Sequence, residues 1–575
     1  MKNFLKMVLA VICGILLLNL IIIAIFAGLA TPSTPSVPSE GVLRIDMSKI
    51  VICEQTQDPD PLSMIQSGGQ TVKNIGIWDA VQALRKAAED PGIKYIYLKT
   101  DGNTTGLALS SELRNALAEY RRESGNPVIS YIEAPTTGSY YLASVADKVY
   151  MTPHPGATMT VNGVSVQMFF LGDLLKKLGV NVQLIRHGKY KSAGEMFTRS
   201  SASPENREQY QQMVSSMWQN MAEEISASRG IEVAQLNDAI DNLKLCLSQD
   251  FVDCGLVDAL LARDALEEQI AVLAVAESYK KVTMIDFADY VGSKVVPSKA
   301  TQKIAVIYAE GNIVDGSATS DVSGDHFASI IEGVRNDKKV KAVVLRVNSP
   351  GGSVLASEKI KHELDLLKAE KPLVASYGEY AASGGYWISN NCEKIFTSPY
   401  TLTGSIGVFG MIPEFSKTAS DLLHVGVEII SSNKHGDALS LTRPFDQAEY
   451  NYMLRSIEDI YDRFTTIVSE GRDIPKEDVD AIGQGRVWTG SDALGIKLVD
   501  EFGTLEDAIA YAAELAGDED LNNWNIKGYP APQTMMEQMV SSMNGKQEDY
   551  TVRIAKELKT PKIVARLPYE ISFMQ

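Results

Sequence analysis

Residues 380–389, YAASGGYWIS, set Ser383 between small residues, with two alanines before it and two glycines after it. The apolar residues 372–375 precede this stretch, and the pattern predicts a strand, a tight turn and a helix that begins at the glycines. A serine at the start of a helix has an uncrowded hydroxyl, and free backbone N–H groups point toward whatever it attacks. Small residues also occur where two elements pack closely, so this stretch alone leaves a nucleophile and a packing contact as alternatives.

A second glycine-bearing stretch, 342–355 (AVVLRVNSPGGSVL), has a similar pattern. Its apolar residues 342–347 predict a buried strand, and Gly351 and Gly352 follow a turn and predict the start of the next helix. Glycines there leave backbone N–H groups unpaired, as an oxyanion hole requires. A Gly-Gly pair is weak evidence by itself, but NSPGGS followed by AASGG at 381–385 is a specific pairing.

Composition predicts a folded protein of two or more domains. The chain has 575 residues, of which 45% are apolar and 22% charged, and this balance excludes general disorder. The net charge of −18 argues against nucleic acid as a partner. Five cysteines without a C-x-x-C pair and six histidines without an H-x-x-x-H pair predict no metal site and no cofactor. Cys246 and Cys254 allow a disulfide outside the cytoplasm, which their spacing does not establish.

The N-terminus predicts a membrane anchor. Residues 7–30 are almost wholly apolar, and at about 1.5 Å per residue they can cross a hydrocarbon core about 30 Å thick. Lys2 and Lys6 precede the apolar run, and no positive cluster follows it at once. Residues 1–6 are therefore predicted to be cytoplasmic and the rest of the chain external.

A cleaved signal peptide is the alternative for this segment, because Gly28 and Ala30 are small residues at a spacing suited to cleavage. The apolar run is longer than the about 7–15 residues of such a signal, which favours an uncleaved anchor. Residues 31–41 are rich in proline and serine and predict an extended linker between the anchor and the body.

From residue 42 onward an α/β pattern occurs twice. The paired stretches are 93–102 with 340–349, 139–153 (SYYLASVADKVYMTP) with 385–399 (GYWISNNCEKIFTSP), and 178–188 (LGVNVQLIRHG) with 425–436 (VGVEIISSNKHG). A helix follows in each half, and Ser203-Pro204-Glu205 predicts the start of the first one. Strands that alternate with helices predict mostly parallel sheets flanked by helices. We therefore expect a first domain at 42–295, a second at 296–520, and a C-terminal tail at 521–575 without an assigned structure.

The two halves differ at the positions that bear chemistry. Thr137 stands at the repeat position of Ser383, and TDGNT at 100–104 replaces NSPGG. Only the second half therefore keeps a candidate nucleophile and a candidate oxyanion hole. A serine hydroxyl needs a base before it can attack a peptide, and no Ser-His-Asp order is evident.

Two lysines of the first half are candidates for that base. Lys189 and Lys191 belong to HGKYKSAGEMF (187–197), and neither has a counterpart in HGDALSLTRPF (435–445). A lysine acts as a base if burial in an apolar site lowers its pKa from about 10.4. On the residues alone, ordinary solvated lysines remain the alternative.

These motifs resemble the Clp-protease and crotonase superfamily, and the chain after residue 40 is similar to the signal peptide peptidase A (protease IV) family of the long, double-length bacterial type. The resemblance implies tandem crotonase-like domains, each a ββα superhelix, after one transmembrane helix. It implies a Ser-Lys dyad, with Ser383 as nucleophile and Lys191, in the Y-K-S-A motif, as general base. By the same resemblance, backbone N–H groups of Gly352 and Gly384 form the oxyanion hole. Ser405, in TGSIGV, either holds the lysine amine or is a turn serine between glycines.

The resemblance also implies an activity and a location. The expected protein is a membrane-anchored serine endopeptidase that degrades cleaved signal peptides and other unfolded or membrane-released peptides. It is expected in the bacterial inner membrane as a single-pass homo-oligomer, a tetramer in known members, with its body on the periplasmic side. Two alternatives remain: a crotonase-type acyl-thioester enzyme, which uses the same glycines without a serine nucleophile, and a catalytically silent membrane scaffold. The retained Ser383, Lys191 and NSPGGS argue against the scaffold.

Overall fold

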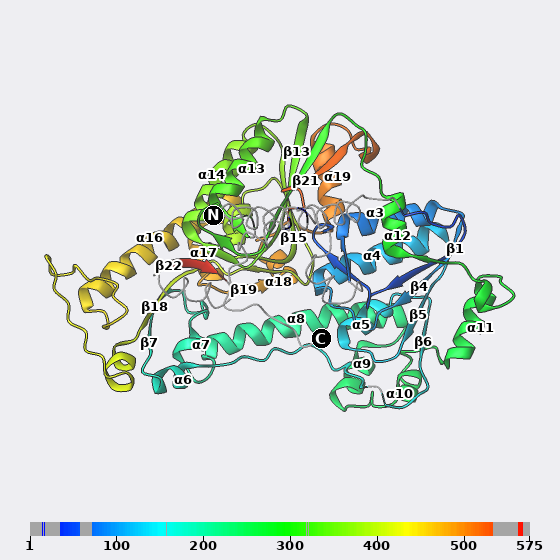
Figure 1. The fold of residues 1–575 in the computed structure, drawn as a ribbon, viewed down its shortest axis with the longest axis horizontal. Helices are drawn as coiled ribbons and strands as arrows, with labels where there is room; N and C mark the ends of the chain where they lie inside the picture. The colour runs from blue at the N-terminus through cyan, green and yellow to red at the C-terminus, as the bar shows by residue number, and fades with distance from the viewer. Residues whose placement is uncertain are drawn as a thin grey trace, which may run out of the picture.

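The structure is a computed structural model that describes residues 35–57, 72–156, 158–317, 319, 321–532 and 562–566, with the single positions 14, 17 and 537. Two α/β halves lie against each other, each built on its own sheet with helices packed on it (Figure 1). None of the helices described there is long and apolar enough to cross a bilayer. The anchor predicted at 7–30 falls outside the described residues, apart from positions 14 and 17.

The first half contains a six-stranded, wholly parallel sheet. In sheet order its strands are β8 (Ala259–Leu260), β6 (Lys148–Met151), β5 (Val128–Ile132), β4 (Ile93–Lys99), β1 (Gly41–Asp46) and β9 (Met284–Asp286). Two further strands, β2 (Ile50–Cys53) and β3 (Lys73–Gly76), pair with each other. The helices are α3 (Ile77–Glu89), α4 (Leu107–Ser124), α5 (Thr137–Ala143), α6 (Gly172–Lys177), α7 (Glu195–Thr198), α8 (Pro204–Arg229), α9 (Val233–Asp241), α10 (Ser248–Asp253), α11 (Arg263–Leu273) and α12 (Phe287–Lys294).

The second half repeats this strand order. The corresponding path is β20 (Glu501–Phe502), β16 (Ile395–Thr397), β15 (Leu373–Ala382), β13 (Val340–Ser349), β10 (Lys303–Glu310) and β21 (Asn525–Tyr529). Two short strands, β17 (Leu402–Gly404) and β19 (Val487–Thr489), extend the sheet beside β15. The helices are α13 (Gly324–Asn336), α14 (Val354–Lys368), α15 (Gly384–Ser389), α16 (Gln447–Arg472), α17 (Lys476–Ile482), α18 (Gly490–Gly495) and α19 (Leu505–Leu515). The duplication predicted from the sequence is thus present in the order of the strands.

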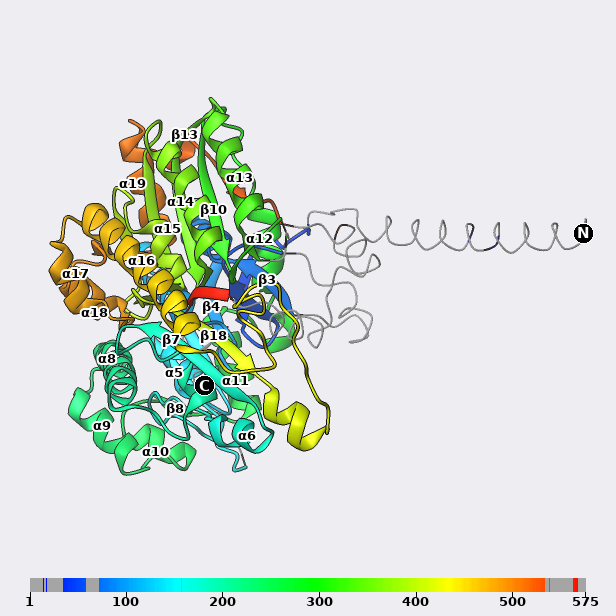
Figure 2. The same cartoon turned by 90° about the vertical axis from the view of Figure 1, so that its left-hand side faces the viewer.

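A third sheet joins the two halves. In order it contains β12 (Val322–Ser323), β11 (Ile313–Val314), β14 (Gly351–Ser353), β22 (Lys562–Arg566), β18 (Val408–Glu414) and β7 (Asn181–His187). Strand β7 belongs to the first half and pairs antiparallel with β18 of the second along its whole length. Figure 2 shows these two strands side by side, with α16 passing over them. Apolar residues of α16 pack on the pair, so this helix holds the junction closed.

Three details differ from the sequence-based expectations. Gly351 and Gly352 lie in β14, and α14 begins only at Val354, because the Ser353 hydroxyl accepts a hydrogen bond from the Ala356 N–H and caps the helix there. The stretch 425–436 forms no strand, although its repeat partner contains β7. Strand β7 has β18 to pair with, whereas 425–436 has no such partner among the described residues.

The third difference concerns the segment 521–575, to which the sequence analysis assigned no structure. Its described residues contribute β21 to the second sheet and β22 to the third.

The start of α8 is as predicted. The Ser203 hydroxyl caps the helix by accepting a hydrogen bond from the Asn206 N–H at 3.1 Å.

The two halves share one hydrophobic core. Alternate residues of β10 point to opposite faces of the second sheet. Ile304, Val306 and Tyr308 pack into a cluster that includes most of the first half's core. The intervening residues, Ala305 and Ile307, pack into the cluster beneath α13 and α14. The halves are therefore held together by continuous apolar packing as well as by the third sheet.

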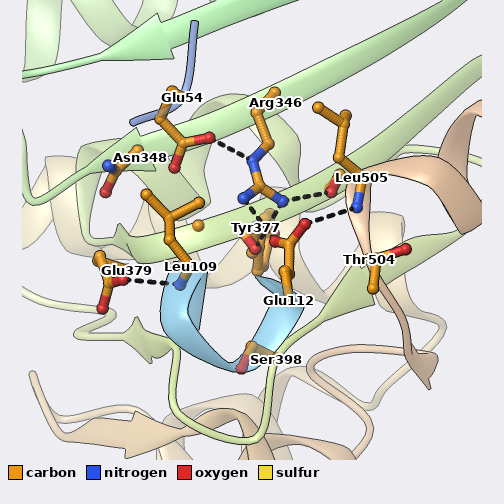
Figure 3. A network of polar contacts seen from close by, with 12 residues as sticks. Glu54, Leu109, Glu112, Arg346, Asn348, Tyr377, Glu379, Ser398, Thr504 and Leu505 are labelled. Carbon is orange, nitrogen blue, oxygen red and sulfur yellow. Dashed lines mark hydrogen bonds and ion pairs between the residues drawn. The ribbon is translucent and has the colours of Figure 1, made fainter. Parts of the chain in front are cut away.

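A buried arginine lies at the junction and is paired with two carboxylates of the first half (Figure 3). Arg346, on β13, donates to Glu54 and to Glu112 of α4, each at 2.6 Å. It also donates to the Ser376 hydroxyl at 2.8 Å and to the Tyr377 carbonyl at 3.1 Å. The three charged side chains are at most 3% exposed, and burial raises the pKa of Glu112.

Removing this arginine should destabilise the protein strongly, because it leaves two buried carboxylates without their counter-ion. We expect Arg346→Met to lower the free energy of unfolding by about 3–5 kcal/mol. The control is Arg463→Met, which breaks the surface pair with Glu358 and should cost less than about 1 kcal/mol. Losing the guanidinium raises the pKa of the buried Glu112 further, so the loss should be smaller at pH 5 than at pH 8. Urea unfolding of the purified full-length chains measures both effects, and equal losses in the two variants would contradict this account.

Candidate active site

Ser383 lies in a strained turn between the end of β15 and the start of α15. Its backbone has φ 56° and ψ −112°, a conformation that costs a serine on the order of 1–3 kcal/mol. The Ser383 N–H donates to the Gly404 carbonyl at 2.8 Å, and its own carbonyl accepts from the Trp387 N–H at 2.8 Å. These two bonds hold the turn and leave the hydroxyl at the start of the helix, as the sequence predicted.

Lys191 reaches the hydroxyl from the other half of the chain. Its Nζ lies 2.9 Å from Ser383 Oγ and 2.9 Å from Ser405 Oγ, and it donates to the Ser405 carbonyl at 3.1 Å. All three side chains are fully buried. The structure therefore brings together the candidate nucleophile, the candidate base and the second serine that the sequence singled out.

Burial lowers the pKa of the Lys191 amine well below its ordinary value, because desolvation disfavours the ammonium form. The hydrogen-bond partners found for the amine in the described part of the chain are hydroxyl and carbonyl oxygens, which carry no charge. An uncharged amine has a free lone pair and can take the proton of a hydroxyl 2.9 Å away. The arrangement thus has the chemistry of a nucleophile with its general base.

Several groups that the sequence analysis missed hold Lys191 in place. The Arg186 guanidinium donates to the Lys191 carbonyl at 2.7 Å, and the Tyr190 N–H donates to the Gln484 carbonyl at 2.9 Å. Gly485 lies directly against the lysine backbone, where a Cβ would come within 2.5–2.7 Å of Lys191 atoms. Gly485 also has a φ of +79°, which favours glycine. No local pattern marks these residues: Gln484 and Gly485 act from the other half of the chain, and the Arg186 contact depends on how the loop after β7 folds back.

Gly352 and Gly384 lie next to each other beside this dyad. A Cβ added to Gly384 would lie 3.1 Å from the Gly352 amide nitrogen. A Cβ on Gly352 would collide with the Ile313 carbonyl, so only glycine allows β14 to approach β11 this closely. The structure therefore places the two predicted oxyanion donors together, one in β14 and one in the first turn of α15.

Ser405 follows β17. The sequence left open whether it is a turn serine or a contact of the lysine amine, and in the structure it is both. It lies in a turn with φ 51°, and its N–H donates to the Arg486 carbonyl at 2.7 Å. Its hydroxyl and carbonyl oxygens both contact the Lys191 amine. The strained turn is what allows one residue to present two oxygens to the same amine.

The remaining candidates lie away from the site. Lys189 is exposed, and its amine lies 5.1 Å above the Tyr190 ring. The Thr137 hydroxyl donates to the Thr160 carbonyl at 3.2 Å, so this repeat counterpart of Ser383 has a structural contact. Cys246 and Cys254 are free thiols and form no disulfide. Within the described ranges no cluster of three or more His, Cys, Asp or Glu side chains is suited to a metal ion.

The chain is similar in sequence to known peptidases. The chain matches Peptidase family S49 twice, over residues 120–277 and 365–518. It is 36% identical over 526 residues to Protease 4 of Salmonella typhi, covering 88% of this chain and 83% of that protein. It is 33% identical over 504 residues to Protease 4 of Haemophilus influenzae, covering 83% of this chain and 79% of that one. A putative signal peptide peptidase SppA of Enterococcus faecium is 32% identical over 216 residues, which cover 36% of this chain and 62% of that protein.

The geometry predicts how the reactivity of Ser383 depends on pH. We expect a fluorophosphonate to label this serine faster as pH rises, because the Lys191 amine accepts the hydroxyl proton only when it is uncharged. Burial lowers the amine pKa, so the rate should reach its plateau well below about pH 10.4, the ordinary lysine value. Mass spectrometry after timed labelling between about pH 5 and pH 10 gives the profile. The exposed Lys189→Ala control should superimpose on the wild type, and a rise confined to pH values near 10.4 would contradict the assignment.

Proposed function

The chain belongs to peptidase family S49 and is a serine peptidase, and we propose that Ser383 is its nucleophile and Lys191 its general base. The observation that carries the proposal is the 2.9 Å contact between Lys191 Nζ and Ser383 Oγ inside a fully buried site. Each half of the chain contributes one of the two groups, so the site is composite. Desolvation supplies the low lysine pKa that the chemistry needs.

The proposed reaction follows from these positions. As Ser383 Oγ attacks the carbonyl carbon of a peptide, Lys191 takes the hydroxyl proton and becomes an ammonium. The N–H groups of Gly352 and Gly384 stabilise the oxyanion that forms. The ammonium then gives its proton to the departing amine, and a water, deprotonated by Lys191, hydrolyses the acyl-enzyme. The hydroxyl and carbonyl oxygens of Ser405 hold the Lys191 amine beside Ser383 Oγ. They also stabilise the ammonium form after it has taken the hydroxyl proton and before it gives that proton to the departing amine.

We propose cleaved signal peptides, and other unfolded or membrane-released peptides, as the substrates. The similarity to a putative signal peptide peptidase of Enterococcus faecium supports this class. The burial of Ser383 and Lys191 supports it too, because a substrate has to enter an enclosed site as an extended segment, which a folded protein does not offer. Neither an acyl-thioester enzyme nor a catalytically silent scaffold needs a contact between a buried lysine and a serine hydroxyl, so this contact argues against both alternatives.

We further propose tandem Clp/crotonase-like domains, each a ββα superhelix, assembled as a homo-oligomer, with a tetramer as the expected size. The segment 422–430 supports the oligomer, since it exposes a run of apolar side chains that are 43–93% exposed: Leu422, Leu423, Val425, Val427, Ile429 and Ile430. In the repeat, 425–436 corresponds to the stretch that contains β7, and β7 pairs with a strand of the other half. A second copy of the chain would give the unpaired segment the same kind of partner.

Residues 7–30 are proposed to anchor the chain in the bacterial inner membrane as a single pass, with the body on the periplasmic side. The support is the apolar sequence with Lys2 and Lys6 before it.

Loss of either member of the dyad should abolish peptide turnover without unfolding the protein. We expect Ser383→Ala to lower kcat/KM for a synthetic signal peptide by about 10⁴-fold or more. Lys191→Arg should fail as well, by at least about 10²–10⁴-fold, because a guanidinium stays protonated. The matched control is Lys189→Arg, the same change two positions away on the surface, which should keep wild-type kinetics. Substantial turnover by Lys191→Arg would show that another group is the base.

Membrane attachment is tested by extraction. We expect the full-length chain to stay in the membrane pellet after alkaline carbonate treatment, whereas a chain that starts at residue 35 should be soluble. The physical reason is that an apolar segment of this length is held by the hydrophobic effect, which high pH does not disrupt. Release of the full-length chain into the supernatant would remove the anchor from the proposal.

A further inference from the structure

Helix α8 of the first half lies against β19 of the second half (Figure 1). Four polar side chains of α8 are spaced three or four positions apart, which places them on one face of the helix. They form hydrogen bonds to residues 486–491 of the second half, and they are Gln209, Gln212, Ser216 and Asn220. Gln209 is the fully buried member, at 1% exposed, and it also contacts the loop at 188–194 that carries Lys191, here called the lysine loop.

The amide nitrogen of Gln209 holds the residues on both sides of Lys191. It donates to the Tyr190 carbonyl at 3.2 Å and to the Ser192 hydroxyl at 3.0 Å. A third acceptor, the side-chain oxygen of Asn206 on α8 itself, lies 3.1 Å away. Because the residues before and after Lys191 are bound to the same amide, the direction in which the lysine side chain leaves the loop is fixed.

The amide oxygen of Gln209 holds the strand that supports both serines. It accepts from the Val487 N–H of β19 at 3.3 Å. Val487 is paired with Gly404, and the Gly404 carbonyl accepts from the Ser383 N–H at 2.8 Å. The carbonyl of the residue before Val487 accepts from the Ser405 N–H at 2.7 Å. One side chain therefore connects the lysine loop to the strand on which the two serine turns rest.

The chemistry of its partners fixes the orientation of this amide. A backbone carbonyl only accepts and a backbone N–H only donates, so Tyr190 requires the NH₂ group and Val487 requires the oxygen. A buried amide whose groups are paired fixes one arrangement of the surrounding chain, whereas an apolar side chain of the same size fills the space without fixing it. The arrangement matters for rate, because a misplacement of about 1 Å at a reacting group can lower turnover by about 10²-fold.

We propose that Gln209 is a positioning residue of this peptidase, whose amide couples the lysine loop to β19 and so sets where the Lys191 amine lies relative to Ser383 and Ser405. The inference rests on the proposed function and deepens it by naming the side chain that keeps the two parts of the composite site in register. Gln209 acts through Lys191 and takes no part in the bond-making steps.

The charged groups around the lysine loop allow the lysine pKa to report on how well the loop is held. They are paired with one another across the neighbouring elements: Arg186 of β7 with Glu195 of α7 at 3.4 Å, and Arg486 with Glu208 of α8 at 3.1 Å. The other titratable groups of this region are the exposed Lys189, His187, which stacks on Tyr461, and Tyr190, whose hydroxyl donates to Glu208. Replacing the uncharged Gln209 by methionine leaves these charges as they are. A loosened loop admits water to the amine, which raises its pKa back toward the ordinary lysine value.

The experiment compares Gln209→Met with Asn220→Met in the purified full-length chain. Asn220 donates to Ser491 at 2.9 Å in the same interface, about three helical turns further along α8. Gln209→Met should lower kcat for the synthetic signal peptide at least about tenfold and leave KM within about twofold. It should also move the midpoint of fluorophosphonate labelling at Ser383 upward by at least about half a pH unit. Asn220→Met should keep the wild-type kcat and midpoint, and urea unfolding measures the stability of each chain in parallel.

A second variant, Gln209→Glu, keeps the shape of the side chain and serves if the methionine variant does not fold. Its carboxylate accepts from the Val487 N–H but cannot donate to the Tyr190 carbonyl. Its negative charge also favours the ammonium form of Lys191, so the labelling midpoint should rise in this variant as well.

The outcomes separate this inference from the proposed function. Wild-type kcat and labelling midpoint in folded Gln209 variants overturn the inference, even if urea shows a loss of stability, because the role is then purely structural. Equal changes in Asn220→Met and Gln209→Met also overturn it, because the effect then belongs to the whole interface. Both results leave the proposed function in place. A wild type without Ser383-dependent turnover of any peptide contradicts the proposed function, and the inference falls with it.

Discussion

The proposed chemistry depends on a buried lysine whose amine can lose its proton. An ammonium is strongly stabilised by water, so Lys191 can act as a base only where water is excluded and no carboxylate lies nearby to hold its proton. Neither half of the chain builds such a place by itself. The loop after β7 supplies the lysine, the turns around Ser383 and Ser405 supply its partners, and Gly485 closes in on the lysine backbone. The pairing of β7 with β18, covered by α16, keeps these parts in register.

Such a contact also requires the halves to be fixed relative to each other. A hydrogen bond of 2.9 Å tolerates only small displacements, so a loose interface between the halves would separate amine and hydroxyl much of the time. The continuous core and the buried Arg346 with its two glutamates prevent this. Buried ion pairs contribute little net stability, yet they penalise any arrangement in which a partner is missing. This cluster therefore acts against misplaced halves more than it adds to the stability of the correct arrangement.

The sequence predicted what local patterns encode. Alternating strands and helices, the repeat, the turn at Ser383 and the capped start of α8 all follow from residues close together in the chain. The motif resemblance selected Lys191 over Lys189, which the physics of isolated residues does not. What local patterns do not encode is pairing between distant parts of the chain, such as β7 with β18, Arg346 with Glu54 and Glu112, and β22 with β14. The stretch 425–436 shows this too. Its sequence is similar to the β7 region, yet it forms no strand, because a strand needs a neighbouring strand to pair with and the described residues offer none.

The separation of Lys191 and Ser383 by 192 positions has a consequence for biosynthesis. A chain made from its N-terminus acquires the lysine long before the serine, and domains tend to fold in the order in which they emerge. Until β18 exists, β7 has no neighbour and the lysine amine is in water, protonated and inert. The nascent chain therefore carries no functional peptidase at any earlier stage of its synthesis. A peptidase whose site is assembled in this way is harmless to its own unfinished copies.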